Sequence, residues 1–445
     1  MPSVTCGPPR EKSAVTGPAP TMTYQEILTH IYGLARFGMK PGLDRIRSIL
    51  SALSNPQNVP RVIHVAGTNG KGSTAAFLSS ILTAAGHRAG LFTSPHLTAF
   101  TERIRVNGAE ISREEVISLA QRVLSAAPPD ATFFEIATAM SYLHFAEREV
   151  DAAIMEVGMG GRLDATNAVE GVLSLISPIS LDHCQHLGNS IASIASEKAG
   201  VIKPGRPVAV AAQDPEAMEI ITGICGQSNS ALFSYGRDFS SSWKDDGLSY
   251  SGIKLHLEGL HPGIPGAYQS GNAALALCAS ELLDEQGMTV TAEAARKGIE
   301  EAFWPGRMET FPGPPRIMLD GAHNPAGARA LAEALKRIPR QRLIMIIGVV
   351  GDKDVNGILM PLTPLAHRII TVTPAIPRGL PSRELAASCR TLGYAAENAG
   401  DVPSGIRTAA SMAGCDDLIL VCGSLFTVGE ARAIMLARNF EPFRG

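Results

Sequence analysis

The chain has 445 residues, a length that favours two or three domains with substantial cores. Apolar residues make up 45% and charged residues 18%, and the formal net charge is only −3, so charge gives no reason to expect binding to nucleic acid or to an anionic membrane. The seven cysteines include no CxxC pair, a pattern typical of reduced thiols in the cytoplasm. No stretch approaches the roughly 20 apolar residues that a membrane span requires. We therefore expect a cytoplasmic globular protein.

The first half of the chain alternates strand-like and helix-like segments. Residues 1–20 are rich in Pro, Ser, Thr and Gly and are predicted to be a disordered leader. Thr23 is a plausible N-cap, because apolar side chains follow it at helical spacing. A β-rich run at Arg61–Ala66 leads through a glycine-rich turn to a predicted helix at Thr74–Ala85. Two more runs are typical of buried strands, Ala152–Val157 and Val172–Ile176. This alternation predicts a mainly parallel sheet with helices on both faces.

In the second half, the alternation of strands and helices is interrupted by a stretch of short strand-like runs and then resumes. Residues 230–265 contain short alternating runs that favour antiparallel strands, and a helix is predicted over Ser270–Glu285. Trp304-Pro305-Gly306 interrupts the chain and marks a hinge. Four strand-like runs then alternate with helices: Arg316–Leu319, Leu343–Ile347, Arg368–Val372 and Leu418–Val421. We predict a P-loop-type, mainly parallel α/β domain over residues 21–302 and a smaller Rossmann-like α/β domain over residues 303–445.

The strongest motif is Gly67-Thr68-Asn69-Gly70-Lys71-Gly72-Ser73, between a predicted strand and a predicted helix. Backbone N–H groups of such a loop can surround a polyphosphate, and the helix N-terminus adds its positive dipole end. Lys71 would place a positive charge on the β- and γ-phosphates, and the Ser73 hydroxyl can meet Mg²⁺ or a phosphate oxygen. The match to the P-loop pattern is imperfect, because Val65 stands at the first glycine position and Gly72 separates Lys71 from Ser73. A turn that merely connects strand and helix is the alternative.

Possible ligands of a hard cation recur in four further segments: Thr93–Leu97, Glu156–Asn167, Leu181–His183 and Glu197–Gly200. Glu156 ends an apolar run at the expected carboxyl edge of the sheet, where a carboxylate is costly unless it meets a cation. A partly exposed charge at a strand end is the alternative for this residue. The crowded His183-Cys184-Gln185-His186 sequence lacks the usual spacing of zinc ligands, which disfavours a zinc site.

Taken together, the segments HVAGTNGKGS, TSPHL, EVGMGGRLDATN, LDH and EKAG resemble the folylpolyglutamate synthase/dihydrofolate synthase family of the Mur ligase superfamily in order and spacing. The resemblance extends from about residue 24 to residue 435. It implies that Ser94, Glu156 and His183 hold Mg²⁺, and that Lys198 is carbamylated by CO₂ and supports a second Mg²⁺. A lysine in a plain salt bridge is the alternative for Lys198.

The same resemblance implies a pterin site and a nucleotide site. The pterin site would be lined by Thr132-Phe133-Phe134-Glu135 and by Arg162-Leu163-Asp164, although the two phenylalanines can equally be core residues. In the second domain, the implied nucleotide contacts are Asn272, Arg307 and Asp320, with His323 in the same segment as Asp320. Arg307 directly follows the hinge, so it can reach the ATP phosphates when the domains close.

Two further segments match without a clear role, and a third is a departure that concerns the choice of substrate. Gly351–Asp354 and Val421–Ser424 resemble loops that face the cleft between the domains. Gly38–Arg45 stands near where bifunctional relatives contact dihydropteroate, in a stretch that varies within the family. The preferred acceptor therefore stays open.

The chemistry implied by the resemblance is acyl activation by ATP. The γ-phosphoryl group passes to a carboxylate, and the amine of L-glutamate attacks the acyl phosphate to form an amide. Lys71, His183 and Lys198 are the expected catalytic residues, with Arg307 and two Mg²⁺ ions stabilising charge on the phosphates. The expected substrates are ATP, L-glutamate and dihydropteroate or a reduced folate.

Both dihydrofolate synthase and folylpolyglutamate synthase activity are implied, and a folylpolyglutamate synthase alone is the alternative. A monovalent-cation requirement is left open. Two-domain relatives are commonly monomeric, so we expect a monomer without nucleic-acid or membrane partners. A cell-wall Mur ligase is disfavoured, because only about 60 residues precede the phosphate loop, too few for the extra N-terminal domain of those enzymes. A P-loop nucleotide switch or a binding protein without synthetic activity is the alternative from another class.

Overall fold

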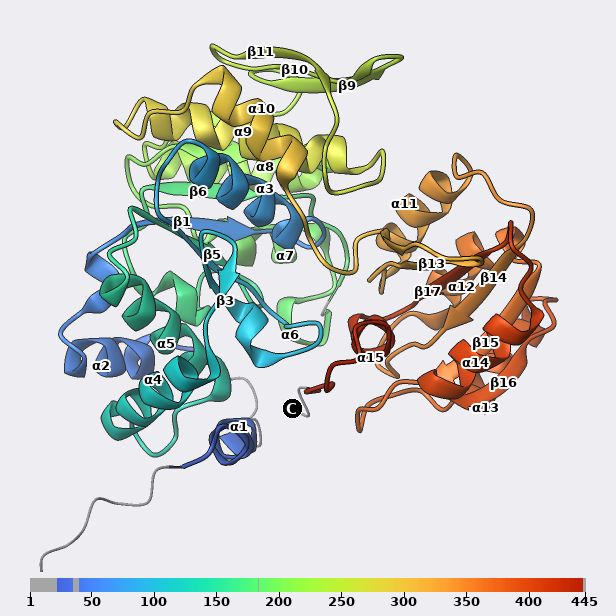
Figure 1. The fold of residues 1–445 in the computed structure, drawn as a ribbon. Helices are drawn as coiled ribbons and strands as arrows, with labels where there is room; N and C mark the ends of the chain where they lie inside the picture. Colours follow the sequence, from blue (N-terminus) through green and yellow to red (C-terminus); the bar gives the residue numbers. More distant parts are fainter. Residues whose placement is uncertain (1–21, 35–39, 183, 443–445) are drawn as a thin grey trace, which may run out of the picture.

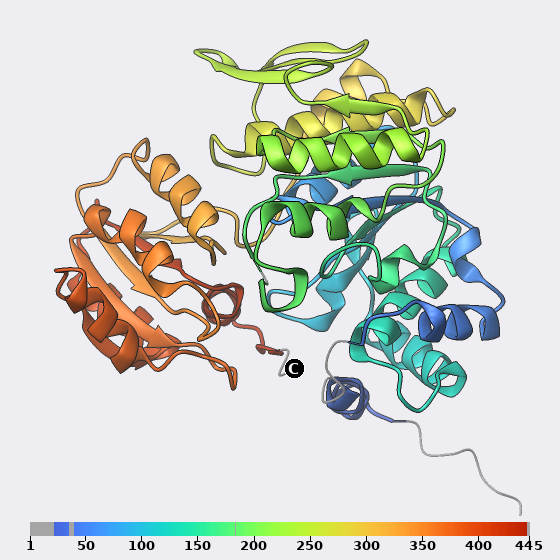
Figure 2. The same cartoon turned by 180° about the vertical axis from the view of Figure 1, so that it is seen from behind.

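The computed structural model describes residues 22–34, 40–182 and 184–442. Two α/β lobes lie side by side: the first lobe is built around an eight-stranded sheet, and the second lobe, which follows it in the chain, around a six-stranded sheet (Figure 1, Figure 2). The predicted leader at residues 1–20 and the predicted metal ligand His183 lie outside the described residues.

The first lobe contains an eight-stranded sheet in the order β4-β3-β2-β5-β1-β6-β7-β8. Its strands are β1 Arg61–Ala66, β2 Ala89–Phe92, β3 Ile104–Val106, β4 Ala109–Glu110, β5 Ala152–Glu156, β6 Leu173–Ile176, β7 Val208–Val210 and β8 Leu232–Ser234. Six neighbouring strands of this sheet, β2, β5, β1, β6, β7 and β8, are parallel. At one edge, β3 pairs with β2 and β4 pairs with β3, both in antiparallel orientation. Because β1 pairs with both β5 and β6, the loops that follow these three strands meet at one edge.

Helices cover both faces of this sheet. They are α1 Tyr24–Gly33, α2 Asp44–Ala52, α3 Lys71–Ala84, α4 Arg113–Ala126, α5 Phe133–Glu147, α6 Cys184–Leu187, α7 Ile191–Ala199, α8 Pro215–Gln227, α9 Gln269–Asp284 and α10 Ala292–Glu301. One apolar core lies under α3, α9 and α10, and another under α1, α2, α4 and α5. A three-stranded antiparallel sheet, β9 Ser240–Lys244, β10 Gly247–Ser251 and β11 His256–Leu260, packs outside α9 and α10 (Figure 1).

The second lobe contains a six-stranded sheet in the order β12-β13-β17-β14-β15-β16. Its strands are β12 Glu309–Phe311, β13 Arg316–Leu319, β14 Leu343–Ile347, β15 Arg368–Thr373, β16 Glu397–Asp401 and β17 Leu418–Cys422. All pairs are parallel except β12 with β13. The helices are α11 Pro325–Leu335, α12 Val355–Leu362, α13 Ser382–Thr391, α14 Val402–Met412 and α15 Leu425–Met435.

The predicted fold class is confirmed: a mainly parallel α/β lobe with a phosphate loop precedes a smaller α/β lobe. Thr23 caps α1 through a capping box with Glu26, as its position predicted. The helix after the phosphate loop begins at Lys71 rather than at Thr74, because Gly70 in a left-handed conformation serves as its N-cap. The boundary at residues 302–303 stays a prediction, and it falls between the end of α10 and the start of β12.

Among the described residues, no helix combines the length and the apolar character needed to cross a bilayer. The cysteines in the described ranges are free thiols: Cys184, Cys225, Cys278, Cys389, Cys415 and Cys422.

The C-terminal tail after α15 returns to the first lobe. Its Glu441 carboxylate accepts hydrogen bonds from the Tyr24 hydroxyl at 2.9 Å, from the Phe100 N–H at 3.0 Å and from the Arg113 guanidinium at 3.1 Å. The Glu441 N–H donates to the Thr98 carbonyl at 2.9 Å. One tail residue thus joins α1, α4 and the loop after β2.

Candidate active site

The predicted phosphate loop connects β1 to α3, as the sequence indicated. Gly67 and Gly70 have φ values of +138° and +86°, which L side chains rarely adopt. A Cβ at Gly67 would collide with Ser177, and a Cβ at Gly70 would collide with the Asn272 side chain. The loop therefore requires glycine for backbone conformation and for space, and the N-terminus of α3 begins directly at Lys71.

Two lysines converge on this loop. The Lys71 ammonium donates to the carbonyls of Gly67 and Thr68, both at 3.3 Å, and the Lys198 amine of α7 donates to the Gly67 carbonyl at 2.7 Å. Lys198 is only 5% exposed. Burial, with a contribution from the charge of Lys71, lowers the pKa of Lys198 to about 7. Two basic groups on one carbonyl favour an anion beside the loop.

Glu156 and Ser94 lie next to the loop at the carboxyl ends of β5 and β2. Glu156 is 6% exposed, and among the described residues its side chain accepts a single hydrogen bond, from the Ser94 N–H at 3.1 Å. Burial raises the pKa of Glu156, and the charge of Lys71 opposes that shift. A buried carboxylate with unused acceptor capacity fits a cation.

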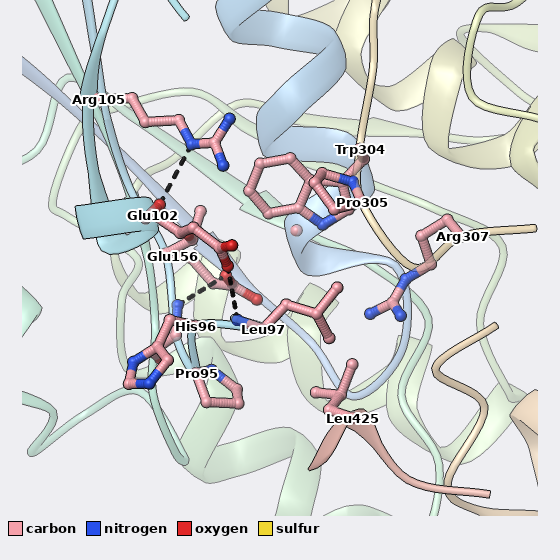
Figure 3. A pocket seen from close by; sticks show the side chains of 13 residues that line it. Pro95, His96, Leu97, Glu102, Arg105, Glu156, Trp304, Pro305, Arg307 and Leu425 are labelled. Atoms are coloured by element: carbon pink, nitrogen blue, oxygen red, sulfur yellow. Dashed lines mark hydrogen bonds between the residues drawn. The ribbon is translucent and has the colours of Figure 1, made fainter. Parts of the chain in front are cut away.

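These residues line a small cavity of about 50 Å³ (Figure 3). Glu156 and Arg307 approach it from opposite sides, and Ser94 and Gly72 also line it. The described residues contain no cluster of three or more His, Cys, Asp or Glu side chains suited to a metal. A divalent cation here would therefore need the Ser94 oxygen, a modified Lys198, His183 or phosphate oxygens beside Glu156.

The predicted nucleotide residues of the second half surround the hinge. The Asn272 amide lies against Gly70 and donates to Gln269 at 2.7 Å. Arg307 borders the small cavity, so it lies where a phosphate chain on the loop would extend. Its guanidinium donates to the Gly306 carbonyl at 3.1 Å.

Asp320, at the end of β13, is largely occupied by the protein. Its carboxylate accepts from the Met308 N–H at 3.0 Å, from the Tyr268 hydroxyl at 3.0 Å and from the Ala322 N–H at 2.9 Å. Burial raises its pKa, and the charge of Arg307 opposes that shift. Asp320 thus anchors the chain after the hinge, and its contact with a nucleotide stays a prediction.

A contact between the lobes was missed by the sequence reasoning. Lys353 of the second lobe forms an ion pair with Asp182 at 2.7 Å, and Asn324 donates to the Asn69 side chain of the phosphate loop at 2.8 Å. His323 lies 4.0 Å from Asp182, and burial lowers the pKa of His323 to about 4, so its imidazole is neutral at neutral pH. Lys353 and Asn324 stood in matching segments, but nothing in the sequence indicated their partners.

A cleft of about 820 Å³ opens beside the phosphate loop and is lined by both lobes. Ring packing distinguishes the two predicted pterin phenylalanines. Phe133 is 5% exposed and packs under the Arg103 guanidinium, 5.1 Å from its ring centre. Phe134 is less buried and lies against Gly158, where a Cβ would come within 2.6 Å of its ring. Lys40 from the predicted variable segment also borders the cleft.

The polar members of the pterin segments are largely engaged within the protein. Thr132 and Glu135 form the capping box of α5, and Arg45 contacts Glu135 at 3.0 Å. Arg162 pairs with Glu197 at 2.7 Å at the rim of the cleft. Leu163 lines the cleft wall.

Asp164 caps the turn that follows, and its carboxylate accepts from the N–H groups of Gly158 and Met159, both at 3.1 Å. It also accepts from the Thr166 N–H at 3.0 Å and hydroxyl at 2.6 Å. Contacts of this segment with substrate stay predictions.

Comparison with known proteins gives consistent matches over both lobes. The Mur ligase middle domain matches residues 65–280, and the Mur ligase glutamate ligase domain matches residues 306–425. A dihydrofolate synthase/folylpolyglutamate synthase of Bacillus subtilis is 36% identical over 434 residues, which covers 92% of this chain and 98% of that protein.

Two solved structures have the same fold. Escherichia coli FolC in complex with DHPP and ADP superimposes with a TM-score of 0.86 at 33% identity, covering 95% of this chain and 99% of that one. A bifunctional folylpolyglutamate synthase/dihydrofolate synthase from Yersinia pestis, complexed with AMPPNP and Mn ion, gives a TM-score of 0.85 at 32% identity, covering 95% of this chain and 100% of that one.

Proposed function

The chain belongs to the folylpolyglutamate synthase/dihydrofolate synthase family of Mur ligases, and on this premise we propose that it is an ATP-dependent ligase joining L-glutamate to a folate-type carboxylic acid. The carrying observation is the position of the phosphate loop, Lys198 and Glu156 beside a two-lobed cleft of about 820 Å³. That volume accommodates a pteridine acceptor and an amino acid together.

The phosphate loop positions ATP for attack by the acceptor. Backbone N–H groups and Lys71 hold the β- and γ-phosphates, and Arg307 approaches them from the hinge. The acceptor carboxylate attacks the γ-phosphorus and ADP leaves. The glutamate amine then attacks the acyl phosphate carbon, loses a proton and expels phosphate. Phe134 offers a ring face to the pteridine.

Glu156 and Ser94, with His183 and Lys198 as further expected ligands, would hold Mg²⁺, which neutralises phosphate charge when bound. The burial of Lys198 supports a carbamate at this position. A neutral amine reacts with CO₂ to give a carbamate and a proton, and a pKa of about 7 leaves much of this amine neutral at physiological pH. As an ammonium group Lys198 would repel a divalent cation, whereas a carbamate is an anionic ligand.

We extend the proposal to both acceptors, dihydropteroate and tetrahydrofolate, with a folylpolyglutamate synthase alone as the alternative. The partners are then small molecules and the protein is a monomer, which light scattering can test. Free thiols at the described cysteines suit the reducing cytoplasm. We place the boundary between the catalytic lobes at residues 302–303, directly before the hinge at Trp304-Pro305-Gly306.

Product masses test this function. Purified protein is incubated with Mg²⁺-ATP, L-glutamate and either dihydropteroate or tetrahydrofolate. One added glutamyl unit on each acceptor is expected. Product from tetrahydrofolate but not from dihydropteroate would favour the alternative, a folylpolyglutamate synthase without dihydrofolate synthase activity. A folded, nucleotide-binding preparation that forms neither product contradicts the folate assignment. ADP release that does not depend on glutamate would instead favour a nucleotide switch.

A further inference from the structure

The loop Ser94–Thr98 of the first lobe docks onto α15 of the second lobe. The Leu97 side chain belongs to the apolar core of the second lobe, together with Val428 and Leu319. A Cβ at Gly429 would collide with the Leu97 carbonyl oxygen, so the backbone of the loop lies directly on the helix. The loop that carries a candidate metal ligand is therefore in contact with both lobes.

A buried ion-pair network borders this contact. Arg432 of α15 contacts Glu309 of the second lobe at 2.9 Å and Glu102 of the first lobe at 3.7 Å. The three side chains are exposed by only 9%, 9% and 7%, respectively. One guanidinium thus faces two buried carboxylates that come from different lobes.

Each carboxylate also holds a segment of the site. Glu102 accepts from the N–H groups of Leu97 at 2.7 Å and Thr98 at 3.0 Å, close to Ser94 in the chain (Figure 3). Glu309 accepts from the Gly306 N–H at 2.9 Å, directly before Arg307. Arg432 is therefore connected to both sides of the small cavity.

We propose that Arg432 is a positioning residue that fixes the Ser94 loop and the Arg307 segment relative to one another across the nucleotide site. Buried ion pairs contribute little net stability, because desolvation offsets much of the attraction, so stability alone explains this network poorly. Loss of the guanidinium would remove the group that joins Glu102 to Glu309, so the two segments that these carboxylates hold would no longer be fixed relative to one another. The inference rests on the proposed function for the chemistry of the site. The effect of Arg432 on nucleotide affinity can nevertheless be measured without the folate reaction.

A double-mutant cycle on nucleotide affinity tests the proposal. Binding of Mg²⁺-AMPPNP is measured by calorimetry for the unaltered chain, Arg432→Met, Arg307→Ala and the double variant. Arg432→Met is expected to weaken binding about 10-fold when Arg307 is present but only about 3-fold when it is absent, because coupled residues are not additive. Equal losses in both backgrounds would overturn the proposal.

Two further variants keep the test interpretable. Arg432→Lys retains the charge but not the two-sided geometry of the guanidinium, and it replaces Arg432→Met in the cycle if that protein does not fold. Arg342→Lys disrupts the pair that Arg342 forms with Asp417 inside the second lobe, and it should leave the affinity unchanged. An equal loss in Arg342→Lys would indicate general loosening and would contradict the proposal. Failure of the unaltered chain to make folate products would contradict the proposed function without affecting this cycle.

Discussion

Two regions of the candidate site, one at the phosphate loop and one on the wall of the large cleft, use buried polar groups in different ways. At the phosphate edge, defined by Gly67–Ser73, Glu156 and Lys198, each of the two buried ionisable side chains makes a single hydrogen bond among the described residues. At the acceptor wall, defined by Thr132–Glu135 and Arg162–Asp164, the carboxylates are engaged by their own turns and by Arg45. A buried ionisable group with few protein hydrogen bonds is expected to meet the charge of a ligand. A carboxylate whose hydrogen bonds are all made within the protein instead holds the backbone of the wall in place.

This difference separates the expected effects of mutation. Changes at the phosphate edge should remove activity with little loss of stability, because few protein contacts depend on those side chains. Changes at the acceptor wall should remove stability first, because several backbone N–H groups depend on them.

Lys71→Ala probes the phosphate edge most strongly. We expect kcat to fall by at least about 10³-fold, because the charge that stabilises the transferring phosphoryl group is lost. The midpoint of thermal unfolding should stay within about 3 °C, since the hydrogen bonds of the Lys71 side chain within the described residues go to two loop carbonyls, both at 3.3 Å. ADP release and circular dichroism measure the two quantities. Lys336→Ala, at the exposed C-cap of α11, is the matched control. Near-normal kcat in Lys71→Ala would remove the phosphate-loop assignment.

Glu156→Gln separates charge from shape at the same edge. We expect about a 10²-fold loss of kcat at fixed Mg²⁺, because the anionic ligand is gone. The raised pKa means that the folded state holds the proton more tightly than the unfolded state, so the carboxylate costs stability as pH rises from 4.5 through the folded pKa. At pH 7 without metal, the variant should therefore be more stable than the unaltered chain in urea denaturation. A less stable variant would mean that Glu156 is a structural residue.

Asp164→Ala probes the acceptor wall. The N–H groups of Gly158, Met159 and Thr166 lose their acceptor, which should lower the free energy of unfolding by about 2–3 kcal/mol. Urea denaturation measures the loss, and the affinity for Mg²⁺-AMPPNP should change little. The exposed Asp130→Ala is the control and should cost less than about 0.5 kcal/mol. Unchanged stability with lost activity would place Asp164 in the catalytic group instead.

The pH dependence of stability tests Lys198. Its folded pKa of about 7 lies below the ordinary value of 10.5, so between these values the unfolded chain binds more protons and stability rises with pH. In CO₂-free buffer without metal, the rise should amount to roughly 1 kcal/mol per pH unit between pH 7 and 9. Lys198→Met should lack this part of the slope in parallel urea titrations. Identical slopes would show that the amine keeps its charge in the folded protein.

Much of the fold was predictable because buried parallel strands appear as short apolar runs. β1 and the four predicted strands of the second lobe were located to within one residue. β16 was missed because Glu397–Asp401 contains no apolar run, and it lies at the edge of the sheet. The start of α3 was missed because a left-handed glycine can cap a helix as well as end a turn.

The candidate site was only partly predictable. Lys71, Glu156 and Ser94 converge because parallel topology brings strand ends to one edge, which the sequence pattern implies. The roles of Asp164 and Arg432 depend on backbone N–H groups and on partners from distant segments. No local pattern encodes those distances, so a structural carboxylate and a ligand-binding one look alike in the sequence.

The hydrogen bonds that Glu441 forms with the first lobe have a consequence for how the protein folds during synthesis. The hydrogen bond from Tyr24 to Glu441 joins two residues that are 417 positions apart in the chain. On the ribosome, α1 is synthesised well before the tail, so Tyr24 cannot form this hydrogen bond until Glu441 has been added. Glu441 also forms hydrogen bonds with Thr98, the last residue of the Ser94 loop, and with Phe100, which lies two residues further along the chain. A nascent chain therefore completes this side of its active site only after Glu441 has been synthesised.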